Sequence, residues 1–294
     1  MKVGLVLEGG FMRGAYVAGA LRALADLGLK KFEVISAVSI STFSAAYFVT
    51  GQYAEMVHIW RNIVTSKDFI GWRVFLKHGR IYNINKLVFE VFTKQVPFAK
   101  QVFKDSATEV FFAVTNHETG EVEYLNNHTP GDIFYKMICA TANFHVHPPK
   151  YKSGGQYYQD GGFVSPLTLD KAVAEGCDKI IFIRTKKEYG QEYDYLMPLT
   201  KYFWPKMYQA YLKRVANFKL NQELVEDLTK RGKILVIAPK NISRYERWTT
   251  KPHKLGAWVE MGYRECLEVF TRNQDFLPIN DPKEFLAIKN PGQF

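Results

Sequence analysis

Two strand–turn–helix units at the start of the chain constrain its fold more than any other feature. An apolar run at residues 3–7 reaches a glycine-rich turn, after which apolar residues recur at helical spacing as far as Gly28. A second apolar run at residues 32–36 leads into a helix expected over residues 42–49. Successive strand–helix units favour a parallel sheet covered by helices.

The rest of the chain continues this alternation. Further strands are expected at residues 110–114, 179–183 and 234–238. Helical spacing predicts helices near residues 130–142, 167–176, 199–230 and 254–271. A hairpin turn within residues 116–125 predicts one antiparallel strand added to the sheet. The fold class that follows is α/β, with three α/β/α layers and a mostly parallel central sheet.

Length and composition fit a globular protein with a large core. A length of 294 residues allows one or two domains, and one large α/β domain is the simpler interpretation. Hydrophobic residues make up 47% and charged residues 23%, which excludes general disorder. Residues 66–105 are dense in aromatic and basic side chains, and two interpretations stay open: a cap over an active site, or ordinary packing beneath surface helices.

The formal charge of +10 would draw the protein toward anionic surfaces such as phospholipid or nucleic acid, or it reflects a basic, solvated surface. No nucleic-acid module accompanies the charge, so no nucleic acid is expected as a partner. Cys139, Cys177 and Cys266 are too few and too far apart for a disulfide framework, which fits a cytoplasmic setting. No stretch has the ~20 apolar residues needed to span a bilayer, so we expect membrane contact to be peripheral.

The glycine-rich turn at residues 8–14 is the first candidate site. Its N–H groups, together with the start of the following helix, would bind negative charge, and both a nucleotide phosphate and the oxyanion of an acyl-transfer intermediate fit. A dinucleotide site would need Gly-x-Gly-x-x-Gly and an acidic residue after the second strand. Here the spacing differs and the second strand ends near Ala37, which disfavours the nucleotide.

Two further motifs are ambiguous when each is taken alone. Ser39 lies where the second strand passes abruptly into a helix, as a nucleophile elbow requires, but a serine there also serves as an ordinary helix cap. Asp160 precedes two glycines, a pattern typical of a β-turn.

Together, the three motifs resemble those of the patatin-like phospholipase family, and the similarity covers residues 1–270. That family has a Gly-Gly-Gly-x-x-Arg-Gly turn, a Gly-x-Ser-x-Gly elbow and a distant Asp-Gly-Gly or Asp-Gly-Ala. The corresponding residues here are Gly9-Gly10-Phe11-Met12-Arg13-Gly14, Ala37-Val38-Ser39-Ile40-Ser41 and Asp160-Gly161-Gly162. The resemblance implies a patatin-like hydrolase domain at residues 1–270, with residues 271–294 as an extension packed on it.

The resemblance also implies an acyl-ester or phospholipid hydrolase with a Ser–Asp dyad. Ser39 would be the nucleophile and Asp160 the general base, and the reaction would pass through an acyl-enzyme. Lipid or ester would be the substrate, and no cofactor or metal is implied. The oxyanion turn would comprise Gly9, Gly10, Phe11, Arg13 and Gly14.

Three residues depart from the family pattern. Phe11 replaces a glycine of the turn, and Ala37 and Ser41 replace both glycines of the elbow. If any of these positions needs a positive φ, a side chain there would cost about 1–2 kcal/mol and would move a catalytic N–H. A catalytically weak or inactive protein of the same fold, which binds lipid or a protein partner, is therefore the alternative function.

Two other interpretations concern histidines and bases. His145 and His147 are the histidines best placed for a Ser–His–Asp triad, but nothing at ligand spacing supports a metal site there. Bases and aromatics recur along residues 186–254, which fits either a helix at an anionic lipid interface or a solvated face that packs its aromatics inward.

Overall fold

The protein has a mixed sheet at its centre. The structure is a computed structural model that describes residues 1–66, 69–70, 74, 76, 82–141, 151–187, 201–203, 205–249 and 251–286. The described strands form one sheet in the order β5–β6–β3–β2–β1–β7–β8, and β4 pairs with β3. Their bounds are β1 Val3–Leu7, β2 Val34–Val38, β3 Glu109–Asn116, β4 Val122–Asn126, β5 Lys152–Ser153, β6 Gln156–Asp160, β7 Lys179–Ile183 and β8 Ile234–Ile237.

Most of the central strands are parallel, as expected. β1 pairs in parallel with β2 and β7, β2 with β3, and β7 with β8. β4 pairs antiparallel with β3 through the turn expected within residues 116–125. β5 and β6, which the sequence did not indicate, are also antiparallel.

The longer helices have bounds close to those expected. They are α1 Gly14–Asp26, α2 Ser41–Val49, α7 Ile133–Thr141, α8 Leu169–Ala174, α10 Pro205–Lys230 and α11 Pro252–Arg272. The shorter helical segments are η1 Phe11–Arg13, α3 Tyr53–His58, η2 Ile59–Ile63, α5 Ile84–Lys86, η3 Leu87–Gln95, α6 Lys100–Lys104, η4 Gly161–Phe163, η5 Arg244–Trp248 and α12 Pro282–Leu286.

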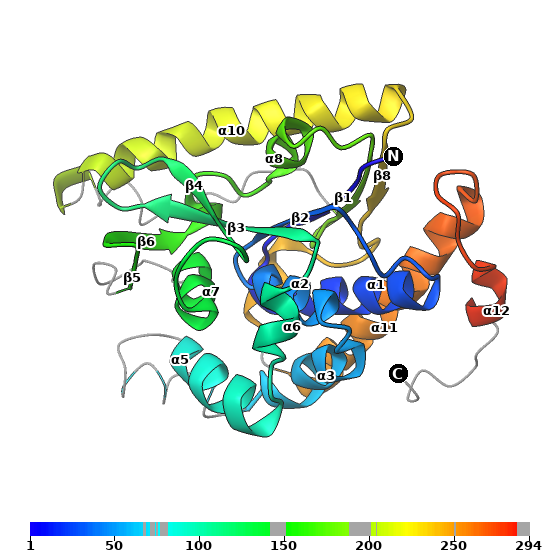
Figure 1. The fold of residues 1–294 in the computed structure, drawn as a ribbon, viewed down its shortest axis with the longest axis horizontal. Coiled ribbons are helices and arrows are strands. Elements are labelled where there is room, and N and C mark those ends of the chain that lie inside the picture. Colours follow the sequence, from blue (N-terminus) through cyan, green and yellow to red (C-terminus); the bar gives the residue numbers. More distant parts are fainter. Residues whose placement is uncertain are drawn as a thin grey trace.

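Helices cover both faces of the sheet, which confirms the three-layer α/β/α prediction. Figure 1 shows α8 and α10 over one face, and α1, α2, α7 and α11 on the other side. Successive side chains of a strand point to opposite faces of the sheet, so β1 contributes to the core on each face. Leu5 and Leu7 pack on the side of α1, α2, α7 and α11, whereas Val6 packs on the side of α8 and α10. Phe218 of α10 lies in the core around Val6, so this helix packs an aromatic side chain inward.

The end of β2 differs from the expectation in a way that matters for the site. The strand runs over Val34–Val38 rather than residues 32–36, because its backbone pairs with β1 from Gly4 to Leu7. Although Phe32 is buried, it precedes this ladder. The strand therefore ends immediately before Ser39.

Two features concern the periphery of the fold. In the described part of the chain, no helix combines the length and the apolarity that crossing a bilayer requires. The segment that follows α11 contacts the end of α1. Asn280 donates from its backbone to Leu27 O at 3.0 Å and from its side chain to Asp26 O at 3.1 Å.

Candidate active site

The glycine turn and the serine elbow lie side by side because they follow neighbouring parallel strands. Leu7 of β1 pairs with Ala37 of β2, so both strands end at the same edge of the sheet. The Ser41 hydroxyl donates to Glu8 O at 2.8 Å and joins the two segments. A Cβ atom at Gly9 would lie 2.9 Å from Ser39 Cβ, so only glycine allows the turn to approach the serine this closely.

Ser39 has the strained backbone of an elbow. Its φ is +57°, and α2 begins two residues later, with Thr42 N donating to Ser39 O at 3.0 Å. A residue other than glycine with its backbone in this left-handed region lowers the stability of the fold by about 1–2 kcal/mol. Among the described residues, neither Ala37 nor Ser41 has a positive φ, so the cost anticipated for these replacements does not arise.

Phe11 is the departure that does carry a cost. Its φ is +53°, the conformation in which glycine is normally favoured. Its ring lies 4.9 Å from the ring of Tyr82 and 4.8 Å from that of Trp248, measured between centroids. The N–H groups of Gly10 and Phe11 have no acceptor among the described residues. The turn therefore has two N–H groups available for an anion beside Ser39.

Arg13 and Gly14 support the turn from behind. Arg13 is buried, and both its backbone N and its Nε donate to Gly10 O, at 3.1 and 3.3 Å. Gly14 begins α1 against Trp60, whose ring would lie 2.4 Å from a Cβ at this position.

Asp160 reaches Ser39 through β6. β3 pairs with β2 as far as Ala113, and β6 takes over at Val114, which pairs with Asp160. β4 occupies the other edge of β3 there, so β6 continues the line of β2 and brings Asp160 beside the elbow. Ser39 Oγ donates to Asp160 Oδ2 at 2.5 Å, although 121 positions separate the two residues.

The surroundings of Asp160 make its carboxylate unusually basic. Burial raises the pKa of Asp160 from its usual 3.8 to about 6. The Ser39 hydroxyl, the Gly162 N–H at 2.8 Å and the charge of Arg214 each oppose this rise by favouring the ionised form. The Thr115 hydroxyl donates to Asp160 O at 3.0 Å and holds the backbone at the end of β6.

The buried carboxylate of Glu8 anchors the turn to the segment that follows β7. Glu8 Oε2 accepts from Thr185 N at 2.7 Å, and its Oε1 lies 3.9 Å from Lys186 Nζ. The Thr185 hydroxyl donates to Gly9 O at 3.0 Å. These contacts could not be predicted from the sequence, because the residues after β7 look like an ordinary polar loop.

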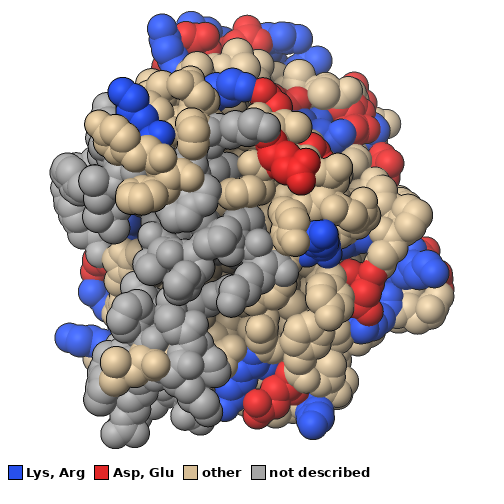
Figure 2. Space-filling model, turned by 90° about the vertical axis from the view of Figure 1, so that its left-hand side faces the viewer, with Lys and Arg blue, Asp and Glu red and all other residues tan. Residues whose placement is uncertain are grey.

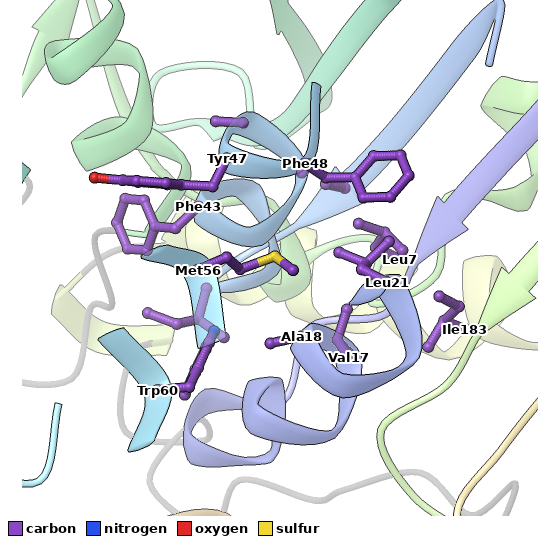
Figure 3. Packing of buried hydrophobic residues seen from close by; sticks show 14 of the residues in the cluster. Leu7, Val17, Ala18, Leu21, Phe43, Tyr47, Phe48, Met56, Trp60 and Ile183 are labelled. Atoms are coloured by element: carbon purple, nitrogen blue, oxygen red, sulfur yellow. The ribbon is translucent and has the colours of Figure 1, made fainter. Parts of the chain in front are cut away.

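A small apolar cavity lies behind the elbow. It has a volume of about 10 Å³, enough for about one water, so no acyl chain fits it without movement of side chains. Figure 3 shows several of its side chains between α2 and the α3–η2 segment. The cavity is lined by Ile40, Phe43, Ser44, Tyr47, Met56, Ile59, Trp60, Val64, Leu87 and Phe92.

Several predicted features fall partly or wholly outside this site. His145 and His147 lie outside the described residues. In the described part of residues 66–105, Phe92 and Phe98 are buried and Phe89 is exposed, whereas Tyr82 contacts Phe11 of the turn. Among the side chains that the structure describes, no three His, Cys, Asp or Glu residues gather as metal ligands.

Two family models match different parts of the chain. A family model described as Patatin-like phospholipase matches residues 5–173, more than half of the chain. A second model, Domain of unknown function (DUF6363), matches residues 204–278. The solved structure of VipD from Legionella pneumophila has a TM-score of 0.51 and 14% identity, and covers 92% of this chain and 67% of that one, which supports the fold.

Curated relatives align with just over three fifths of the chain. Lysophospholipase nte1 of Neurospora crassa is 25% identical over 193 residues, and patatin-like phospholipase domain-containing protein 7 of Rattus norvegicus is 27% identical over 192. Each alignment covers 62% of this chain, but only 12% and 13% of those longer proteins. The Escherichia coli protein YjjU is 23% identical over 194 residues, covering 63% of this chain and 52% of YjjU. With more than half of its length matched by the family model, the chain belongs to the patatin-like phospholipase family.

Proposed function

We propose that the protein is a lipid acyl-ester hydrolase in which Ser39 is the nucleophile and Asp160 the general base. The observation that carries the proposal is the 2.5 Å hydrogen bond from Ser39 Oγ to Asp160 Oδ2, at a serine with φ of +57°. Family membership and relatives named lysophospholipase support lipid as the substrate class.

The reaction begins with proton transfer within this pair. As Ser39 Oγ bonds to the ester carbonyl carbon, its proton passes to Asp160 Oδ2, and the carbonyl oxygen becomes an oxyanion. The N–H groups of Gly10 and Phe11 stabilise the oxyanion, and one such donor is typically worth about 3 kcal/mol. Arg13 fixes this turn through Gly10 O.

The intermediate then collapses to an acyl-enzyme. The C–O bond to the alcohol breaks, and Asp160 returns its proton to the leaving oxygen. Water next attacks the acyl carbon while Asp160 takes a proton from it, and the second collapse releases the fatty acid and reprotonates Ser39. A pKa of about 6 makes Asp160 a stronger base than an ordinary carboxylate, and still leaves it mostly ionised at neutral pH.

The alternative is a non-catalytic protein that binds lipid or a protein partner. The strained Phe11 in the turn favours this alternative, whereas the short Ser39–Asp160 hydrogen bond favours the hydrolase. Hydrolysis of p-nitrophenyl esters of several chain lengths distinguishes them, with wild type, Ser39→Ala and Asp160→Asn compared side by side. We expect turnover in wild type alone. Equal rates in all three proteins, or no turnover and no labelling of Ser39 by a fluorophosphonate, would contradict the hydrolase.

We also propose peripheral contact with anionic membranes through α10, as the sequence suggested. Leu212, Val215 and Leu220 are exposed there beside Lys213 and Lys219. Figure 2 shows bases and acids interspersed along the top of the molecule, the level at which α10 lies. We therefore expect weak, salt-sensitive binding, measured by sedimentation with phosphatidylserine-containing vesicles. Equal binding to pure phosphatidylcholine vesicles would contradict an electrostatic contribution.

A further inference from the structure

The segment of unknown function, residues 204–278, contacts both halves of the candidate site. α10 meets the backbone that follows Asp160, and η5 meets the turn that contains Phe11. We propose that this segment positions the active site, with Arg214 and Trp248 as its two positioning residues. The inference rests on the proposed hydrolase function.

The first contact is a polar stripe on α10. Arg214, Asn217 and Asn221 recur at intervals of three and four residues, so they lie on one face of the helix. Arg214 Nη1 donates to Gly162 O and, at 3.5 Å, to Phe163 O.

The stripe continues along the loop. Asn217 Nδ2 donates to Val164 O at 3.2 Å. Asn221 Oδ1 accepts from Leu169 N at 2.9 Å and from Asp170 N at 3.2 Å. Asn221 is buried, and its contacts with backbone groups leave its amide side chain no freedom to face solvent. α10 therefore holds the loop that begins directly after Asp160.

The loop after Asp160 does not pair with any of the described strands, so its backbone groups need other hydrogen-bond partners. Arg214, Asn217 and Asn221 of α10 are such partners. Buried backbone groups require partners, and a loop whose partners are removed changes its path. Phe163 and Val164 also pack with Ala210 and Tyr211 of α10, which fixes the loop from a second direction. The direction of the Asp160 carboxylate follows from this path, because Gly162 N donates to Asp160 Oδ1.

Arg214 also acts on Asp160 through its charge. β3 contributes the uncharged Thr115 to the surroundings of Asp160, and the elbow contributes Ser39. Among the described residues, Arg214 is the charged side chain whose field reaches the carboxylate, and it favours the ionised base. Removal of this charge should therefore raise the pH at which Asp160 becomes active.

The second contact supports the oxyanion turn. The ring of Phe11 contacts those of Tyr82 and Trp248, and Trp248 comes from η5. These two aromatic contacts fix the side chain of Phe11 and so stabilise its positive φ. Loss of the Trp248 ring should let the Phe11 N–H leave its position without any change in the titration of Asp160.

Esterase kinetics as a function of pH test both contacts, together with the rate at which a fluorophosphonate labels Ser39. Arg214→Gln should lower kcat about tenfold to a hundredfold, with KM nearly unchanged, and should move the acid limb to higher pH. Arg214→Lys, which keeps the charge, should lower kcat but leave the acid limb in place. Arg272→Gln removes an exposed charge from α11, in the same 204–278 segment, and serves as the matched control.

Trp248 is tested with the same assays. Trp248→Ala should lower kcat and slow labelling with the acid limb unmoved, and Trp248→Phe should recover most of the rate. Free methylguanidine should partly restore Arg214→Ala, an effect that a merely structural defect would not show.

The outcomes separate this inference from the proposed function. No labelling of folded wild-type protein would overturn both. Normal labelling of wild type, with the same rate and acid limb in Arg214→Gln and the same rate in Trp248→Ala, would overturn this inference alone. If Arg214→Gln lacks the wild-type circular dichroism spectrum, Arg214→Lys and Asn217→Ala decide, and wild-type rates in both would overturn it.

Discussion

Asp160→Asn should make the folded protein more stable at pH 8, because the wild type keeps a carboxylate where its charge is disfavoured. Burial raises the pKa of Asp160 from 3.8 to about 6 despite the opposing contacts with Ser39, Gly162 and Arg214. The two values differ by about 2.2, and each pH unit corresponds to about 1.36 kcal/mol. The ionised carboxylate therefore lowers the free energy of unfolding by about 3 kcal/mol at pH 8.

The gain should depend on pH in a definite direction. A carboxyl with a raised folded-state pKa adds its full stability below its unfolded pKa, and loses that stability as the pH rises through its folded pKa. Wild type should thus lose stability between pH 3.8 and about 6, where the asparagine variant has nothing to titrate at this position. The advantage of the variant should fall from about 3 kcal/mol at pH 8 to about 1 kcal/mol at pH 4.5.

Equilibrium unfolding in urea at these two pH values measures the difference. Other groups titrate in both proteins, so comparison of the two isolates residue 160. Asp275→Asn, at an exposed turn residue, is the matched control and should change stability by less than about 0.5 kcal/mol. An advantage that is absent at pH 8, or that is equally large at pH 4.5, would refute the assignment of Asp160 as a dehydrated base.

Three further outcomes are expected. The kcat/KM for a p-nitrophenyl ester should fall about tenfold per pH unit below pH 6, because only ionised Asp160 accepts the proton, and a flat profile from pH 5 to 7 would argue against this base. Ser41→Ala removes the hydrogen bond to Glu8 O and should cost about 1 kcal/mol in urea unfolding, whereas no change would show that the bond contributes nothing. Gly19→Ala would place Cβ 1.9 Å from a backbone oxygen of α11 and should lower the free energy of unfolding by about 1–3 kcal/mol. Gly256→Ala, in open space on α11, should raise the free energy of unfolding by about 0.5–1 kcal/mol. Equal effects of the two substitutions would contradict the close crossing of α1 and α11.

The sequence was sufficient to predict the sheet and one side of the site. Hydrophobic periodicity marks β1 and β2 clearly, and parallel neighbours must end at the same edge, which brings Gly10 beside Ser39. The end of β2 was predicted two residues early, since a buried Phe32 looks like part of the strand when only the pattern is available.

The other side of the site depends on contacts that no local pattern carries. β6 has the polar residues Gln156 and Gln159 on either side of two tyrosines, so its pattern resembles a loop before a β-turn. Only its pairing with β3 explains how Asp160 meets Ser39. Arg214 lies in a run of bases and resembles any solvated cation of an exposed helix. Its role becomes visible only when α10 is packed against the loop after Asp160.

Strain and unfavourable charge concentrate where the proposed chemistry would occur. Among the described residues other than glycine, only Phe11 and Ser39 have a positive φ, and each costs about 1–2 kcal/mol. Asp160 adds the dehydration of its carboxylate. Such costs persist only where the surroundings over-determine the local structure, and here Gly9, the sheet edge and the 204–278 segment do so. At the elbow the positive φ belongs to Ser39, so Ala37 and Ser41 replace the family glycines without strain. At the turn the positive φ belongs to Phe11, the residue that replaces a glycine. This position therefore needs support from the aromatic rings that contact Phe11.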